Sequence, residues 1–168
     1  MAKENGLPDG SYVVMKLELG NLQSVRDFVT NLKAFKSARP LNHLICNAAV
    51  YLPKDPQPQW TDDGIEMSMG VNHLGHFLLV NLLLEDMSRA KGARVCIVGS
   101  ITGNTNTVGG GLVYPFADLG KLQGFEKGMT KPVTMADGKP FFGAKAYKDS
   151  KVRMFEQLIS SYIFFCLL

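Results

Sequence analysis

Cysteine is scarce in this sequence, and its distribution limits the kind of protein it encodes. The 168 residues include three cysteines, Cys46, Cys96 and Cys166, with no Cys-x-x-Cys pair. An odd number without paired spacing fits a reducing compartment better than a disulfide framework. Cys46 and Cys96 lie in apolar runs typical of strands, where a buried free thiol is the usual state.

Runs of like charge and long apolar runs are also missing. Lysine and arginine exceed the acids only slightly, giving a net charge of +3, and the basic residues are scattered. Nothing therefore favours a nucleic-acid partner. The apolar stretch at residues 158–168 is much shorter than the roughly 20 residues that a membrane span needs. The first residues have no signal-peptide or transit-peptide character.

Two further kinds of site lack the required pattern. The glycine cluster at residues 109–111 has no strand directly before it and no helix start after it, so it does not predict a phosphate-binding turn. His73 and His76 lie close together if they share a helix, but no third ligand has convincing spacing. We therefore expect no metal site.

Tyr147 and Lys151 carry the strongest chemical signal. The i,i+4 spacing places both side chains on one face of a helix. An ammonium about 5 Å from a phenol favours the phenolate by roughly 3 kcal/mol at an effective dielectric of about 20, which suits proton transfer near neutral pH. Tyr12 and Lys16 have the same spacing, but they lie in a run with strand character, where such residues are about 13 Å apart.

The hydrophobic pattern predicts alternating strands and helices, as in an α/β fold. Apolar or alternating runs predict three strands, at Ser11–Leu19, Leu41–Cys46 and Ala93–Gly99. One helix is expected after Asn21, and another from Thr61 to about Glu85 that is apolar nearly all round from Phe77 to Leu84. The proline-rich stretch Leu52–Trp60 predicts a loop, and residues 103–143 predict a long insertion loop.

Four residues in order resemble the catalytic set of the short-chain dehydrogenase/reductase family: Asn72, Ser100, Tyr147 and Lys151. The turn Asn47-Ala48-Ala49 after an apolar strand adds to the likeness. The resemblance implies a partial doubly wound, Rossmann-like parallel sheet flanked by helices. It also implies that NADPH contacts Asn47, Ala48, Ala49, Val71, Tyr147 and Lys151. Glu18 stands where the family usually has an aspartate beside the adenine, so a solvated carboxylate is an equal alternative.

The long insertion between Ser100 and Tyr147 resembles one branch of that family, the light-dependent NADPH:protochlorophyllide oxidoreductases. The likeness implies hydride transfer from NADPH to a double bond of the tetrapyrrole protochlorophyllide, in chlorophyll biosynthesis within a plastid. Tyr147 would donate the proton, Lys151 would tune it and hold the nicotinamide ribose, and Ser100 and Asn72 would position groups. Asn72 would also hold a helix kink. The insertion would cover the pigment.

The likeness ends near Val152, which predicts a partial family domain over residues 1–152 and an unrelated apolar tail over residues 153–168. The family's glycine-rich turn belongs to a first strand and helix that have no counterpart here. Two alternatives therefore stay open, namely an inactive fragment that at most binds partners, and a generic NADPH-dependent carbonyl reductase. The apolar tail allows peripheral membrane association, and a homo-oligomer is also compatible with the sequence.

Overall fold

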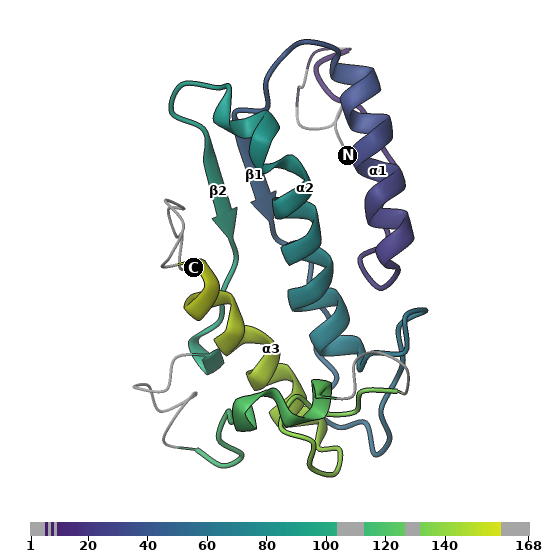
Figure 1. Cartoon of the computed structure of the whole chain (residues 1–168), viewed down its shortest axis with the longest axis vertical. Helices are drawn as coiled ribbons and strands as arrows, with labels where there is room; N and C mark the ends of the chain where they lie inside the picture. The colour runs from purple at the N-terminus through teal and green to yellow at the C-terminus, as the bar shows by residue number, and fades with distance from the viewer. Residues whose placement is uncertain (1–5, 7, 9, 104–112, 127–131, 159–168) are drawn as a thin grey trace.

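Two short parallel strands form the sheet of the fold (Figure 1). The computed structural model describes residues 6, 8, 10–103, 113–126 and 132–158, with side chains through Val152. Strand β1 spans His43–Cys46 and β2 spans Arg94–Ile97, with His43 opposite Arg94 and Cys46 opposite Ile97. Both strands fall inside the ranges that the apolar runs predict. Parallel strands need a crossover connection, and here a helical segment supplies it.

The crossover consists of a π-helical segment, η1 (Met69–Gly75), followed by the α-helix α2 (His76–Ser88). Val80 and Met87 pack against the sheet residues, whereas Leu79 and Leu83 pack against the first helix. Helix α2 therefore contacts the sheet on one side and α1 on another, as Figure 1 shows.

Helix α1 (Leu22–Lys36) begins where its capping residue predicts. The side chain of Asn21 accepts a hydrogen bond from the Ser24 amide at 2.7 Å, and Asp63 accepts one from the Leu22 amide at 2.8 Å. These bonds satisfy amides that the first helical turn leaves unpaired.

The sequence predicts that the second helix begins at Thr61, but it begins later. The contact between Asp63 and the Leu22 amide explains the difference. Because Asp63 caps α1, it is not available to start the next helix. Glu66 takes that role, since its carboxylate accepts hydrogen bonds from the amides of Ser68 and Met69, each at 3.0 Å. Thr61–Glu66 forms turns and isolated bridges instead.

Asp86 joins α1 to α2 through a buried charge cluster. Lys36 Nζ lies 2.6 Å from Asp86 Oδ1, Arg89 also donates to this oxygen, and the Leu41 amide donates to Oδ2 at 3.1 Å. Burial acts to raise the pKa of Asp86, but these donors outweigh it and hold the pKa below its ordinary value.

The predicted strand at Ser11–Leu19 is wrong. Residues 12–17 form no regular element and pair with no strand in the described part of the chain, and Val14 is 87% exposed. Only the end of the segment is packed, where Leu19 joins the core between α1 and α2. A strand requires a hydrogen-bonding neighbour as well as a suitable pattern, and the described sheet supplies none here.

The apolar residues from Phe77 to Leu84 predict that this helix lies deep in the fold, but one face of α2 is partly exposed. Phe77 and Leu84 are each 43% exposed. Because α2 contacts the sheet and α1 with only part of its circumference, the remaining face is open.

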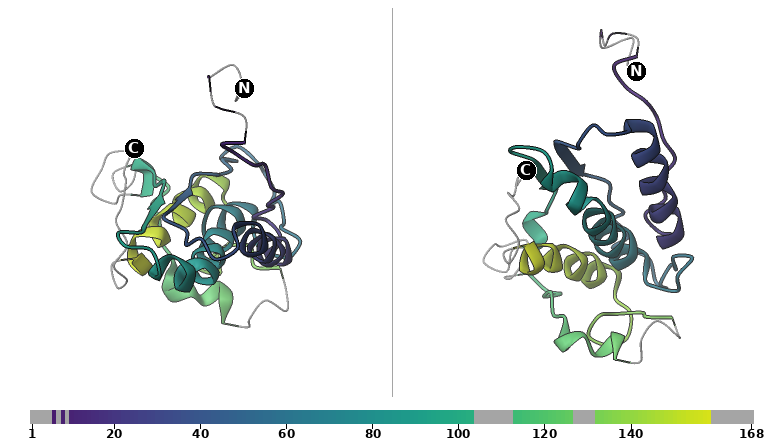
Figure 2. Two further views of the ribbon diagram at one scale, coloured as in Figure 1. Left: turned by 90° about the horizontal axis from the view of Figure 1, so that it is seen from above. Right: turned by 45° about the horizontal axis from the view of Figure 1, so that its top comes forward.

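Helix α3 (Gly143–Leu158) lies beside the end of β2 and the insertion (Figures 1 and 2). The described insertion contains the short 3-10 helices η2 (Ile101–Gly103) and η4 (Gly120–Phe125), and is otherwise mostly irregular, as the sequence predicts. Its two parts meet closely, because a Cβ atom at Gly124 would lie 2.0 Å from the Met135 carbonyl oxygen.

Several sequence-based predictions fall outside the described residues. They concern the glycine cluster at 109–111 and most of the tail, including Cys166. Helix α3 continues past Val152 to Leu158, so the expected domain boundary falls within a helix. Within the described ranges, no helix has both the length and the apolar character needed to cross a membrane.

Candidate active site

Tyr147 and Lys151 lie on the same side of α3, one turn apart. Lys151 Nζ is 5.8 Å from the centre of the Tyr147 ring, as the helical spacing predicts. Tyr12 and Lys16, which share that spacing, lie in the segment 12–17, where no helix brings them together. Only Tyr147 and Lys151 therefore have the helical geometry that places both side chains on one face.

Lys151 is fixed in position by the end of β2. The residue is only 2% exposed, and its Nζ donates a hydrogen bond to the Val98 carbonyl oxygen at 3.2 Å. Burial lowers the pKa of Lys151. A Cβ atom at Gly103 would lie 3.0 Å from the Lys151 backbone, so glycine permits this close approach.

Asn72 connects three parts of the site from inside the π-helical segment η1. Its Nδ2 donates to the Val50 carbonyl oxygen and to Ser150 Oγ, each at 3.0 Å, and its Oδ1 accepts from the Val50 amide at 2.8 Å. Ser150 Oγ in turn donates to the Tyr147 carbonyl oxygen at 2.7 Å. The fully buried Asn72 thereby holds α3 against η1 and the chain after β1. The helix is irregular at the position where the resemblance implies a kink.

The two histidines of this region have packing contacts. His76 Nδ1 lies 3.2 Å from the Asn72 carbonyl oxygen, and the His73 ring stacks on Phe77 with 6.0 Å between centres. Burial lowers the pKa of His76, and the nearby Lys151 charge lowers it further, so His76 is neutral near pH 7. No group of three or more metal-binding side chains comes together within the ranges that the structure describes.

Ser100 stands at the carboxyl end of β2, between two residues that contact Lys151. Its Oγ lies 2.8 Å from Thr102 Oγ1 and accepts a hydrogen bond from the Thr102 amide at 3.2 Å. Val98 and Gly103, on either side of it, both touch Lys151. The segment that carries Ser100 is thus held against α3.

The residues expected to contact a cofactor fall into two groups. Asn47, Ala48 and Ala49 are exposed at the carboxyl end of β1, the sheet edge at which Ser100 also lies. Glu18, in contrast, accepts a hydrogen bond from the Gly20 amide at 3.1 Å within a local turn. The Val71 side chain is buried in the core beside α1. The cofactor contacts of these five residues stay predictions.

Tyr51 and Ser150 belong to the same site but were not identified from the sequence. The Tyr51 ring packs edge-on against the Tyr147 ring, with 4.5 Å between centres, although Tyr51 itself is 64% exposed. Ser150 could have been found, because it lies three residues after Tyr147 and hence near the same helical face. Tyr51 gives no comparable local signal, since the contact joins segments far apart in the chain.

This arrangement is suited to proton transfer at the carboxyl edge of a parallel sheet. It combines a half-buried phenol, an ammonium fixed one turn away and a hydroxyl at a strand end. Open α/β sheets bind their ligands at this edge.

Comparison with curated proteins finds relatives that are named protochlorophyllide reductase. A chloroplastic protochlorophyllide reductase of Chlamydomonas reinhardtii is 57% identical over 153 residues, which cover 90% of this chain and 38% of that protein. The protochlorophyllide reductase of Avena sativa is 54% identical over 157 residues, covering 90% of this chain and 49% of that protein. Protochlorophyllide reductase A of Arabidopsis thaliana is 51% identical over 155 residues, covering 90% of this chain and 38% of that protein. The chain thus spans less than half the length of these relatives.

Solved structures show the same fold at low sequence identity. The 3-alpha-hydroxysteroid dehydrogenase of Pseudomonas sp. B-0831, complexed with NADH, aligns with a TM-score of 0.60 at 18% identity over 91% of this chain and 56% of its own. A metagenomic short-chain oxidoreductase in complex with NADP aligns with a TM-score of 0.57 at 16% identity, over 95% of this chain and 58% of its own. Part of a doubly wound α/β sheet is therefore present. The profile described as short chain dehydrogenase matches residues 1–131, and the chain belongs to that family.

Proposed function

We propose that this chain carries the proton-donating part of a light-driven protochlorophyllide reductase that uses NADPH. The single observation that carries the proposal is the placement of Lys151 Nζ 5.8 Å from the Tyr147 ring, on a helix tied to both η1 and β2. The names of relatives at 51–57% identity support the substrate. The long insertion before Tyr147 supports the same branch of the family.

The residues present fit the nicotinamide end of such a cofactor. Asn47–Ala49 are exposed at the carboxyl end of β1, and Ser100 lies at the corresponding end of β2, which leaves this edge open to a ligand. Tyr147 and Lys151 would hold the ribose hydroxyls there, and the turn at Asn47 would brace the sheet beside them. When bound, NADPH supplies the hydride, and the protein aligns the reactants.

The chain's own part in the reaction is to deliver one proton. The Tyr147 hydroxyl donates it to one carbon of the pigment double bond while the neighbouring carbon receives the hydride, so the double bond becomes a single bond. The Lys151 Nζ lies 5.8 Å from the centre of the Tyr147 ring while this transfer takes place. The Val98 carbonyl and the Asn72–Ser150 contact keep both side chains in place. The pigment absorbs the light that drives the step.

A second candidate is a chain that binds partners or pigment without turnover. It is favoured by one observation, which is that Lys151 is only 2% exposed and its Nζ is bound to the Val98 carbonyl oxygen, as in a structural contact. A generic NADPH-dependent carbonyl reductase would differ from both in reducing its substrate in darkness.

The test is pigment reduction by the purified chain with NADPH, in light and in darkness, using Tyr147→Phe as the variant. We expect conversion only in light and at least a hundredfold loss in Tyr147→Phe, since a positioned proton donor contributes about 10²–10⁴-fold. Tyr12→Phe is the matched control, because Tyr12 has the same spacing to a lysine but no helix, and it should leave the rate unchanged.

Each alternative has its own result in this assay. Conversion that is as fast in darkness as in light supports an ordinary carbonyl or enone reductase and overturns the light-driven proposal. No conversion by the wild-type chain, with saturable pigment or NADPH binding, supports the binding-only candidate. NADPH titration of Tyr147→Phe separates a lost proton donor from a lost cofactor site.

Location and assembly belong to the same proposal. The relatives from Chlamydomonas reinhardtii and Arabidopsis thaliana are named chloroplastic, and we extend that location to this chain. Peripheral membrane association and a homo-oligomer stay predictions. Sedimentation of the purified chain with and without lipid vesicles tests both of them.

A further inference from the structure

The side of α3 away from Tyr147 fastens the insertion to the helix. Lys148 Nζ donates to the Val113 carbonyl oxygen at 2.8 Å, and Lys145 Nζ donates to the Asp118 carbonyl oxygen at 2.6 Å. Asp149 Oδ1 accepts a hydrogen bond from the Asp118 amide at 2.9 Å. Lys145, Lys148 and Asp149 thus hold the insertion against α3 at Val113 and Asp118.

Charge is unbalanced at these contacts. Lys145 Nζ lies 2.6 Å from Asp149 Oδ2 and 3.0 Å from Asp137 Oδ2, and both carboxylates are fully buried, with 1% and 0% of their side chains exposed. Lys139 also reaches Asp137, at 3.4 Å, but it is 62% exposed and lies closer to Asp118. The two buried carboxylates therefore share the partly buried Lys145 ammonium, and only Asp137 has a further cation, the exposed Lys139, so the negative charge of Asp149 is the less well compensated.

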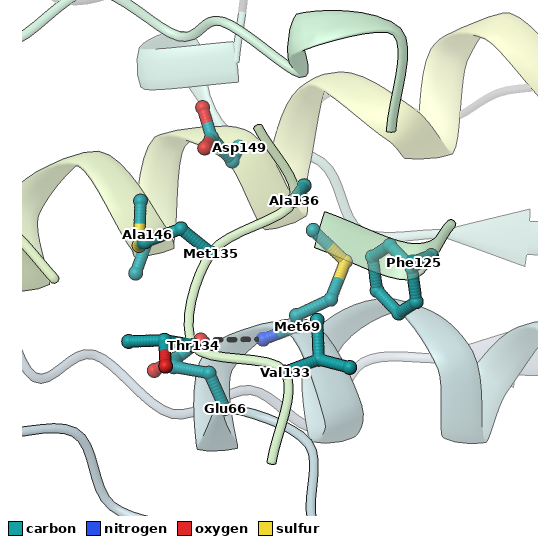
Figure 3. A pocket seen from close by; sticks show the side chains of 9 residues that line it. All are labelled: Glu66, Met69, Phe125, Val133, Thr134, Met135, Ala136, Ala146 and Asp149. Carbon is teal, nitrogen blue, oxygen red and sulfur yellow. Dashed lines mark hydrogen bonds between the residues drawn. The ribbon is translucent and has the colours of Figure 1, made fainter. Parts of the chain in front are cut away.

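A third buried acid faces the same region. Glu66 and Asp149 line one small cavity whose other lining residues are mostly apolar, and in Figure 3 they lie on opposite sides of residues 133–136. Glu66 is 3% exposed, and burial raises its pKa despite hydrogen bonds from the Ser68 and Met69 amides. No cation faces Glu66 among these lining residues.

These surroundings favour protonation of Asp149. Burial raises the pKa of Asp149 to about 6, repulsion from Asp137 adds to the increase, and the hydrogen bonds from Lys145 and the Asp118 amide oppose it. Asp137 differs, because donors from Lys145 and Lys139 outweigh its burial and hold its pKa below the ordinary value. Of the two carboxylates that share Lys145, Asp149 is therefore the one that takes up a proton as the pH falls.

We propose that Asp137, Lys145 and Asp149 form a proton-dependent latch, in which proton uptake by Asp149 tightens the attachment of the insertion to α3. The charged groups around Asp149 are Lys145 on its own helix, Asp137 from the insertion and Glu66 from the chain before η1. Lys139 pairs with Asp137 and Asp118, and Asp118 donates its backbone amide to Asp149. The proposal depends on no enzymatic activity.

The direction of the pH effect follows from linkage between protonation of Asp149 and attachment of the insertion to α3. In an open state, in which the insertion is detached, a solvated Asp149 would titrate near its ordinary pKa of 3.8. In the closed state, in which the insertion is attached, its pKa is about 6. The closed state therefore binds the proton more tightly, and closure strengthens as the pH falls from 6 towards 3.8. The full effect is about a hundredfold in the closing equilibrium, because each pKa unit is tenfold.

Amide hydrogen exchange followed by NMR tests the latch on the whole chain. Protection factors correct for the intrinsic pH dependence of exchange. Two amides report on the latch, the Asp118 amide bound to Asp149 and the Gly124 amide bound to the Ala136 carbonyl oxygen. We expect both to lose at least tenfold in protection between pH 5 and pH 7.5. The Val25 amide at the start of α1 is the internal reference and should not change.

Asp149→Asn is the matched variant, because its side chain keeps an acceptor for the Asp118 amide but carries no charge. Protection in this variant should be the same at both pH values, while Asp27→Asn on the exposed face of α1 should behave as wild type. Equal protection of the wild-type amides at pH 5 and 7.5 overturns the latch, and so does a pH effect that persists in Asp149→Asn. If Asp149→Asn does not fold, the wild-type titration decides, with a midpoint near 6 expected and one below 4.5 contradicting the proposal.

Discussion

The two sides of helix α3 are built from different interactions. The side with Tyr147 and Lys151 is held by uncharged acceptors, namely the Val98 carbonyl and the Asn72–Ser150 pair. The opposite side is held by charges, with Lys145 between Asp137 and Asp149. One helix thus joins a proton-transfer site to an insertion through two kinds of contact.

The difference predicts different responses to pH. On the Tyr147 side the only charged group in these contacts is the Lys151 ammonium, and the other hydrogen bonds join amides, hydroxyls and carbonyls, which do not titrate near neutral pH. Buried carboxylates lose or gain protons when their surroundings change. The insertion can therefore loosen or tighten on α3 while the geometry of Tyr147 and Lys151 is retained.

The largest expected effect is that of Lys145→Met. Removing this ammonium leaves Asp137 and Asp149 buried side by side without their shared partner, and breaking a buried pair in this way costs about 3–5 kcal/mol. The loss in unfolding free energy should be greatest at pH 7.5 and smaller at pH 5, where Asp149 takes up a proton. Chemical denaturation at both pH values measures it, and an equal loss at both would contradict the charge imbalance.

Asn72→Ala should destabilise the chain by about 2–4 kcal/mol, because it leaves the Val50 amide and carbonyl and Ser150 Oγ without their partner in a buried site. The loss should be the same at pH 5 and pH 7.5, in contrast to Lys145→Met. Thermal denaturation measures it. Asn81→Ala is the control, since the Asn81 amide makes an exposed bond to the Phe77 carbonyl and its removal should cost little.

The third prediction concerns Asp149 itself. Because its pKa is raised to about 6 from an ordinary 3.8, its contribution to stability is fully present below pH 3.8 and is lost as the pH rises through 6. The difference in unfolding free energy between wild type and Asp149→Asn should therefore fall by about 2 kcal/mol from pH 4 to 6.5. Other acids, such as Asp86, are the same in both proteins and cancel. A difference that is flat over this range would remove the basis of the latch.

Ser150→Ala should have a smaller effect, about 1–2 kcal/mol, because it removes one hydrogen bond to the Tyr147 carbonyl and one from Asn72. The change acts on the Tyr147 side, so insertion amides such as Gly124 should keep their exchange protection. Loss of protection at Gly124 equal to that at α3 amides would show that the two sides are not separate.

The smallest effect is expected for Tyr51→Ala. Edge-on aromatic pairs contribute about 0.5–1.5 kcal/mol, and the exposure of Tyr51 places this pair at the low end. The stability should change little, while the Tyr147 ring resonances in NMR spectra should shift. Unchanged Tyr147 resonances would argue against the contact in solution.

Local patterns predict the Tyr147 side of the site and miss the charged side. The pairing of Tyr147 with Lys151 follows from helical spacing, whereas Asn72 and Ser100 are expected from the family resemblance. Ser150 was not predicted, although it lies three residues after Tyr147. Asp149 lies in the same five-residue stretch, yet its role depends on Asp137 and Asp118, which the insertion brings from a distance. Contacts that join irregular segments leave no periodicity in the sequence.

The errors in the predicted fold have the same origin. The segment at Ser11–Leu19 has a strand's pattern, but pairing depends on a neighbour that local sequence does not reveal. Asp62 and Asp63 look like the start of a helix, yet they contact Asn21 and Leu22 at the start of α1. In both cases a long-range partner decides the outcome.

The most direct test of the account compares Lys151→Met with Asp149→Asn in light-driven pigment reduction at pH 7.5 with NADPH. The two residues are two positions apart in the sequence and lie on opposite sides of α3. We predict at least a hundredfold loss of rate in Lys151→Met, because the ammonium beside Tyr147 is removed, and a rate within about threefold of wild type in Asp149→Asn. Equal losses in both variants, or a loss confined to Asp149→Asn, would contradict the assignment of proton transfer to the Tyr147 side.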